Sequence, residues 1–266
     1  MKIKAIAVLM VLFALTNMFA GGNGESVYTI EVGGSTSVTP LMELFAAEYA
    51  KVKPNVKVNI NGTGSGDGIT NAGVTYQIGM SSRELTPAEQ GRGLRAEIVA
   101  IDGIAVIVNS NNAVSNLTVE QIRDIYTGAI TNWNQLGGRN ATIAVVSREE
   151  GSGTRGAFEE IIGFQGRLLR NANQLTSTGA ILANIAQNQD AIGYISLGSV
   201  NDTIKAISVG GVAPTAANVV NGSYRVARPF IVLTGSNVHN ESRDFVNWML
   251  GSAGQTIVRR GWIPVR

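Results

Sequence analysis

Short apolar runs alternate with amphipathic stretches along most of the chain. Val27–Val32 and Val56–Ile60 have the length and residue types of strands, and apolar residues between them recur at helical spacing. The run Glu97–Val108 is interrupted only by one Asp-Gly pair, which predicts a buried strand of a parallel sheet. Further strands are predicted at Thr142–Val146, Ala191–Ser196 and Phe230–Leu233.

Helix signals lie between several of these strands. Pro40 suits the first turn of the first predicted helix. Thr118 and Gln121 form a capping-box pattern at the start of a helix over Leu117–Tyr126. Further helices are expected at Ala157–Ile162 and, as the last one, around Phe245, Trp248 and Met249.

This alternation predicts an α/β fold with mostly parallel sheets. A chain of 266 residues has room for two lobes. The natural crossing segments are Ala105–Asn109 and Arg225–Leu233. We therefore expect a first lobe of residues 27–104 plus 227–266, completed by the C-terminal helix, and a second lobe of residues 105–226.

The first 20 residues have the pattern of an export signal. Two lysines near the start precede an apolar run from Ala5 to Leu15, which ends in small residues. A transmembrane helix needs a longer run, about 18–20 apolar residues. We expect residues 1–20 to be a signal peptide and the mature protein to be exported to the periplasm, with an uncleaved anchor as the alternative. The chain has no Cys for lipid attachment.

Composition excludes several kinds of site. The chain has no Cys and a single His, His239, which we expect at the surface near a helix start. Disulfides, Cys/His zinc sites and Cys nucleophiles are thereby excluded, and we expect no metal and no cofactor. The formal charge of +2 comes from Lys2 and Lys4, since the rest of the chain holds 19 basic and 19 acidic residues. Because the rest of the chain has no net positive charge, we expect neither nucleic acid nor a membrane surface as a partner. We also expect a monomer.

Glycine is enriched, with 32 residues in the chain, and polar glycine-containing turns follow several predicted strands. Such turns occupy residues 33–37, 62–68, 79–83 and 148–155, and each carries Ser or Thr. Glycine lets backbone N–H groups approach a ligand, helix starts attract anions, and hydroxyls and an Arg add donors. Because open α/β sheets bind ligands at their strand C-termini, the turns predict a tetrahedral-oxyanion site. Each turn alone can also be just a helix cap.

Asp102 is a carboxylate inside an apolar run, which is costly unless a partner satisfies it. One interpretation is structural, with Asp102 capping a neighbouring turn. In the other, the carboxylate accepts a hydrogen bond from the O–H of a phosphate ion. Such an acceptor would reject fully deprotonated sulfate.

These segments resemble the phosphate-binding proteins of bacterial phosphate ABC transporters, a branch of the type II periplasmic-binding-protein fold. The likeness runs from Val27 to Gly198 and is weaker beyond. It includes Leu117–Gly138, the turn around Gly151–Thr154, and segments reading GGSTSVTPL, NGTGSGDGI and IGMSSREL. The resemblance implies two lobes, each a mostly parallel sheet flanked by helices, with the ligand in the interlobe cleft.

Carried over residue by residue, the resemblance implies phosphate contacts from Thr36, Ser37, Ser65, Arg148, Ser152, Gly153 and Thr154. Some members of the family have an aspartate where this chain has Ser82, and that aspartate accepts the phosphate proton. We include Ser82 in the predicted site and hypothesise that Asp102 takes over as the proton acceptor. Whether Arg83 also contacts the ligand stays open.

The resemblance implies a binding protein that captures inorganic phosphate, closes its lobes around the ion and delivers it to a membrane permease. It implies no catalysis. The same fold could instead take another tetrahedral oxyanion, such as sulfate or molybdate. A phosphoester hydrolase is disfavoured because no nucleophile–base pair is evident and metal ligands are sparse. An exported adhesin or sensor on this fold is a further alternative.

Overall fold

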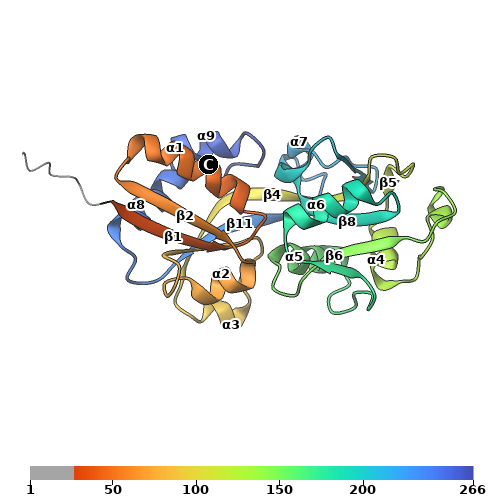
Figure 1. The fold of residues 1–266 in the computed structure, drawn as a ribbon, viewed down its shortest axis with the longest axis horizontal. Coiled ribbons are helices and arrows are strands. Elements are labelled where there is room, and N and C mark those ends of the chain that lie inside the picture. Colours follow the sequence, from red (N-terminus) through yellow and green to blue (C-terminus); the bar gives the residue numbers. More distant parts are fainter. Residues whose placement is uncertain (1–26, 266) are drawn as a thin grey trace, which may run out of the picture.

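The structure is a computed structural model and describes residues 27–265. The predicted signal peptide, residues 1–20, lies outside the described residues. Figure 1 shows two lobes side by side, with strand β4 (Arg95–Asn109) passing from one to the other. None of the helices between residues 27 and 265 is long and apolar enough to span a membrane.

The first lobe is built on three parallel strands, in the order β2 (Val56–Gly62), β1 (Tyr28–Gly34), β3 (Ile78–Ser81). β11 (Ala227–Thr234) and the first part of β4 continue the sheet in antiparallel pairing. The helices of this lobe are α1 (Thr39–Val52), α2 (Ser65–Asn71), α3 (Pro87–Gln90), α8 (Asn240–Leu250) and α9 (Ser252–Val258). A core that includes Phe45, Phe230 and Phe245 holds the sheet and helices together.

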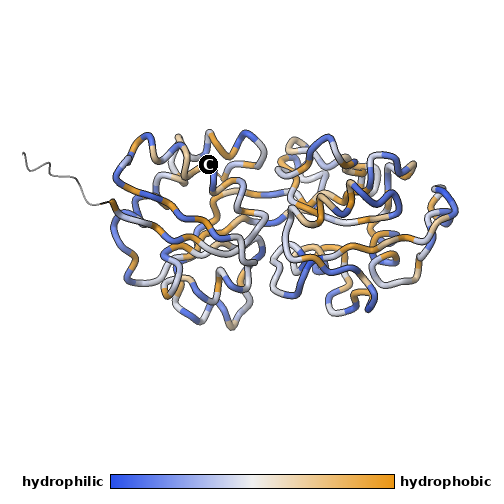
Figure 2. The backbone as a smooth tube through the Cα atoms, in the orientation of Figure 1, coloured by the Kyte–Doolittle hydropathy of each residue, from blue (hydrophilic) through white to orange (hydrophobic). Residues whose placement is uncertain are grey.

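The second lobe continues the sheet from β4 through β8 (Ala191–Ser196) and β6 (Ala144–Arg148) to β7 (Asn173–Leu175). β9 (Ile204–Ala206) also pairs with β4, and β5 (Asn116–Leu117) pairs with β10 (Ser208–Val209). The helices are α4 (Val119–Thr127), α5 (Gly153–Ile162), α6 (Thr178–Gln187) and α7 (Ala216–Val220), with 3-10 turns at Trp133–Leu136 and Leu197–Ser199. Figure 2 shows apolar positions concentrated along the central strands of both lobes.

β4 changes its partner strands where the chain passes between the lobes. Its residues up to Gly103 pair with β11, and those from Ile104 onward pair with β8. The return crossing lies just before β11, where Ile104 N–H donates to the carbonyl of Val226 over 2.7 Å. Ile104 and Val226 belong to the core of the second lobe, whereas Phe230 belongs to that of the first.

The predicted α/β fold with two lobes is confirmed, and so is the capping box of Thr118 and Gln121. Two expectations were wrong. The run Glu97–Val108 lies in β4, which is antiparallel to both β11 and β8. An interior strand of a covered sheet is apolar whichever way it runs, so the apolar run does not reveal strand direction. The helix with Phe245, α8, is also not the last one, because α9 follows directly after Gly251.

Candidate functional site

Serine and threonine residues of the first lobe gather at one edge of its sheet. Ser35, Thr36 and Ser37 follow β1, Ser65 opens α2, and Ser82 follows β3. Because these strands are parallel, their carboxyl ends meet at the same edge. Ser35 donates to Ser82 Oγ over 2.9 Å, and Ser82 N–H donates to Ser65 Oγ over 3.1 Å. All of these residues except Thr36 are buried.

The second lobe presents the predicted 148–155 turn at the carboxyl end of β6. Arg148 is the last residue of that strand, and its side chain is only 2% exposed. Ser152 caps α5 by accepting a hydrogen bond from Arg155 N–H, and Gly153 and Thr154 form the first residues of the helix. The helix start directs backbone N–H groups and the positive end of its dipole toward the first lobe.

Hydroxyl groups from the two lobes meet directly. Ser37 Oγ lies 2.7 Å from Thr154 Oγ1 and 3.2 Å from Thr178 Oγ1, the hydroxyl of the first residue of α6. Thr36 Oγ1 lies 3.4 Å from the same Thr178 Oγ1. We call this set the hydroxyl cluster; it consists of Ser35, Thr36, Ser37, Ser65, Ser82, Thr154 and Thr178. The predicted hydroxyls from both halves of the chain are therefore brought together, except that of Ser152, which caps α5.

The Arg148 guanidinium at the end of β6 is held by a carboxylate fork. Its Nε and Nη2 donate to the two carboxylate oxygens of Glu149 over 2.9 and 2.8 Å. The same two nitrogens also donate to the carbonyls of Leu175 and Thr176. Nη1 takes part in none of these bonds. A Cβ placed on Gly64, just before Ser65, would lie 3.5 Å from Glu149 Oε1, so the ion pair lies against the loop that opens α2.

Hydroxyls, helix-start N–H groups and one guanidinium make a donor-rich site that suits an anion. A hydroxyl can also accept a hydrogen bond, so the cluster can match an oxyanion that still carries a proton. Within residues 27–265, no group of three or more His, Cys, Asp or Glu side chains could hold a metal ion.

The lobes pack closely at Gly153. A Cβ on it would lie 2.3 Å from Ser65 Oγ and 2.9 Å from Ser82 Oγ.

Gly153→Ala should therefore hold the lobes apart and weaken oxyanion binding about 5- to 150-fold, the effect expected of overpacking. Titration calorimetry with phosphate measures this, and Gly156→Ala in the same helix is the matched control. A Cβ at Gly156 meets only the Arg83 side chain, at 3.3 Å. Equal affinities for both variants would contradict the expected contact.

Asp102 lies in β4 next to the point where that strand changes partners, and its carboxylate is engaged there. Its carboxylate accepts from Ser196 Oγ over 2.7 Å and from Arg228 Nε and Nη2 over 3.2 and 3.1 Å. Both side chains of this ion pair are buried. Burial raises the pKa of Asp102 to about 6, since lost hydration outweighs the attraction of Arg228. These contacts are structural, although the main partner is Arg228 and not the turn expected from the sequence, and none of them is to the hydroxyl cluster.

The structure gives a partner to Arg83, whose role the sequence left open, and it adds Thr178 to the candidate site. The Arg83 guanidinium forms a fork with Glu89 at 2.7 and 2.8 Å and so stabilises the start of α3. Thr178 is in the hydroxyl cluster but was not predicted. The sequence does contain a sign of it, because Ser177 and Thr178 also lie in a turn between a strand and a helix, as the other predicted residues do. The strand before them, β7, has only three residues and no apolar alternation.

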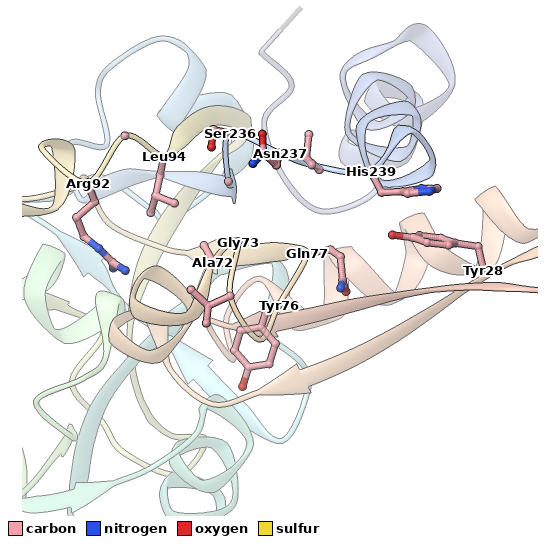
Figure 3. A pocket seen from close by; sticks show the side chains of 14 residues that line it. Tyr28, Ala72, Gly73, Tyr76, Gln77, Arg92, Leu94, Ser236, Asn237 and His239 are labelled. Atoms are coloured by element: carbon pink, nitrogen blue, oxygen red, sulfur yellow. The ribbon is translucent and has the colours of Figure 1, made fainter.

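A separate pocket lies in the first lobe beside the start of β1 and has a cavity volume of about 470 Å³ (Figure 3). Tyr28 and His239 stack along it with ring centroids 4.2 Å apart, and His239 caps α8 at the surface as predicted. The polar side chains of Arg92, Gln77 and Tyr76 are engaged with backbone groups or a carboxylate. We therefore place the candidate site at the hydroxyl cluster.

Comparisons with known proteins show the family of the chain. The family model described as a PBP superfamily domain matches residues 21–253. Phosphate-binding protein PstS from Borreliella burgdorferi is 26% identical over 277 residues, which cover 99% of each chain.

Solved structures are also similar along most of the chain. One from Clostridium perfringens, described as a phosphate ABC transporter substrate-binding protein with bound phosphate, is 45% identical with a TM-score of 0.88, covering 90% of this chain and 100% of that one. An ABC-type phosphate transport receptor from Vibrio cholerae is 36% identical with a TM-score of 0.73, covering 89% and 99%. The chain belongs to the PBP superfamily, in the branch of the PstS-type phosphate-binding proteins.

Proposed function

We propose that the protein captures inorganic phosphate between its lobes and delivers it to the membrane permease of an ABC transporter. The observation that carries this proposal is the meeting of hydroxyls from both lobes, at distances down to 2.7 Å, at the start of a helix whose preceding turn begins with the buried Arg148. The names of the similar proteins from Borreliella burgdorferi and Clostridium perfringens support phosphate as the anion.

The proposed phosphate contacts come from both lobes and are Thr36, Ser37, Ser65, Ser82, Arg148, Ser152, Gly153 and Thr154. Arg148 supplies the one positive charge, and the hydroxyls and N–H groups supply directional donors. Asp102 is left out because its carboxylate is engaged by Arg228 and Ser196. Ser82 is the better candidate for accepting the phosphate proton, because its hydroxyl lies in the cluster and can accept as well as donate.

The proposed lobes are residues 27–104 plus 227–266 and residues 105–226. The change in pairing of β4 between Gly103 and Ile104 lies within one residue of this division. Only short crossing segments join the lobes there, so a hinge motion could open and close the site. The contact between Ser37 and Thr154 belongs to the closed arrangement.

The proposed activity is binding without chemical conversion. The side-chain contacts of Ser37 and Ser65 are to other hydroxyls and, for Ser65, to the backbone N–H of Ser82, whereas a nucleophile needs a base within hydrogen-bond reach. We further propose that the protein acts as a monomer, since one chain supplies both sides of the site. Export to the periplasm is proposed from the signal pattern of residues 1–20.

Calorimetric titration of the purified protein with phosphate, sulfate and molybdate tests the proposal. We expect phosphate to bind in the micromolar range or tighter and more strongly than the other two anions. Phosphate binding only at millimolar concentrations would contradict a role in capture. Release of product from a chromogenic phosphoester, lost in Arg148→Ala, would instead support a hydrolase.

A further inference from the structure

The start of α6 lies at the same sheet edge as the start of α5. β6 and β7 pair in parallel, and Arg148 at the end of β6 lies opposite Leu175 at the end of β7. The turn after β7 leads directly into α6, which Ser177 caps by accepting from Ala180 N–H. A second helix of the second lobe therefore begins next to the proposed phosphate site.

Thr178, the first residue of α6, contacts the first lobe through its side chain and its backbone. Its hydroxyl lies 3.2 Å from Ser37 Oγ and 3.4 Å from Thr36 Oγ1, and its N–H donates to Thr36 Oγ1 over 3.4 Å. The side chain is almost completely buried. Ser37 Oγ thus lies between Thr154 and Thr178, one from each helix start.

Arg148 is hydrogen-bonded to the backbone of the turn before α6. Its Nε donates to the carbonyl of Leu175 over 3.2 Å, and its Nη2 donates to that of Thr176 over 3.3 Å. These bonds set the position of the turn relative to the guanidinium that we propose holds the anion. The placement of Thr178 in the cluster therefore has support independent of its own hydroxyl contacts.

We propose that Thr178 is a further ligand of the anion, contributing its Oγ1–H. This inference rests on the proposed function of the site. A tetrahedral oxyanion has four oxygens, each able to accept more than one hydrogen bond, so donors are needed on every side. Thr178 and Thr154 flank Ser37, so together they can serve anion oxygens on both sides of it.

The competing role for Thr178 is a latch that joins the lobes through Thr36 and Ser37 without touching the anion. A latch and a ligand both lose their hydroxyl in Thr178→Val, which keeps the shape of the side chain. The two roles differ in their effect on bound phosphate, because only a ligand changes the electronic environment of phosphorus. The 31P chemical shift of bound phosphate therefore separates the two roles.

The experiment measures phosphate affinity by calorimetry and the 31P shift by NMR for wild type, Thr178→Val and Thr178→Ser. Thr234→Val is the matched control, because Thr234 has the same 5% exposure but lies in β11 outside the cluster. We expect Thr178→Val to weaken phosphate binding about 10- to 100-fold and to move the 31P shift. Thr178→Ser and Thr234→Val should stay within about threefold of wild type, and the melting temperatures without phosphate should match.

Two results would overturn the inference. Thr178→Val could bind phosphate as tightly as wild type, or it could bind more weakly with the 31P shift unmoved, which would identify a latch. Failure of the wild-type protein itself to bind phosphate is a third and distinguishable result. It would overturn the proposed function and the inference together.

Discussion

Arg148→Met is expected to lose most of the phosphate affinity of the protein. Arg148 supplies the single guanidinium of the proposed site and is 2% exposed, so its bonds to an anion would be little screened by water. Removing one partner of a buried, hydrogen-bonded charge pair costs about 2–5 kcal/mol, which corresponds to an affinity loss of about 30-fold to several thousandfold. Calorimetric titration with phosphate measures the loss.

The conservative change Arg148→Lys should restore part of the affinity. Lysine keeps the charge but lacks the planar fork that donates to Glu149 and an anion at the same time. Arg83→Met is the control, because that guanidinium is engaged by Glu89, and we expect its affinity to stay within about threefold of wild type. If Arg83→Met lost binding while Arg148→Met kept it, the wrong arginine would have been assigned to the anion.

Asp102→Asn should produce the largest loss of stability in this set. The change leaves the Arg228 guanidinium buried without its counter-charge, and its Nη1 already lacks a hydrogen-bond partner. Breaking a buried ion pair from one side costs about 3–5 kcal/mol of unfolding free energy. Urea unfolding at pH 7 measures the change, since the carboxylate, with a pKa of about 6, is ionised there. Glu97→Gln, in an exposed pair with Arg95, should cost less than about 1 kcal/mol.

The double variant Asp102→Leu with Arg228→Met separates a structural role from a ligand role. The double variant leaves no buried charge without a partner. Most of the stability lost in Asp102→Asn should therefore be recovered. Because Asp102 contacts Ser196 and Arg228 and no residue of the hydroxyl cluster, the double variant should bind phosphate within about threefold of wild type. Loss of its preference for phosphate over sulfate would instead revive the hypothesised acceptor role of Asp102.

Local pattern predicted much of the fold because helix starts and buried strands are local features. The capping box of Thr118 and Gln121 formed as expected, since both partners lie within one turn. The antiparallel course of β4 was missed, because its apolar residues report burial and not the direction of neighbouring strands. α9 was missed because it is short and follows α8 directly.

The site shows the same division between local and long-range information. The sequence by itself determined which turns carry glycine, hydroxyls and arginine, and so the chemistry of an oxyanion site, because those properties belong to short segments. Only the tertiary structure decided which polar groups meet. It placed Thr178 142 residues from Thr36 in the chain but within hydrogen-bond distance of it, and it paired Asp102 with Arg228 across 126 residues. Such contacts depend on the order of the strands in the sheet and on how the lobes meet. Neither can be predicted from a single short segment.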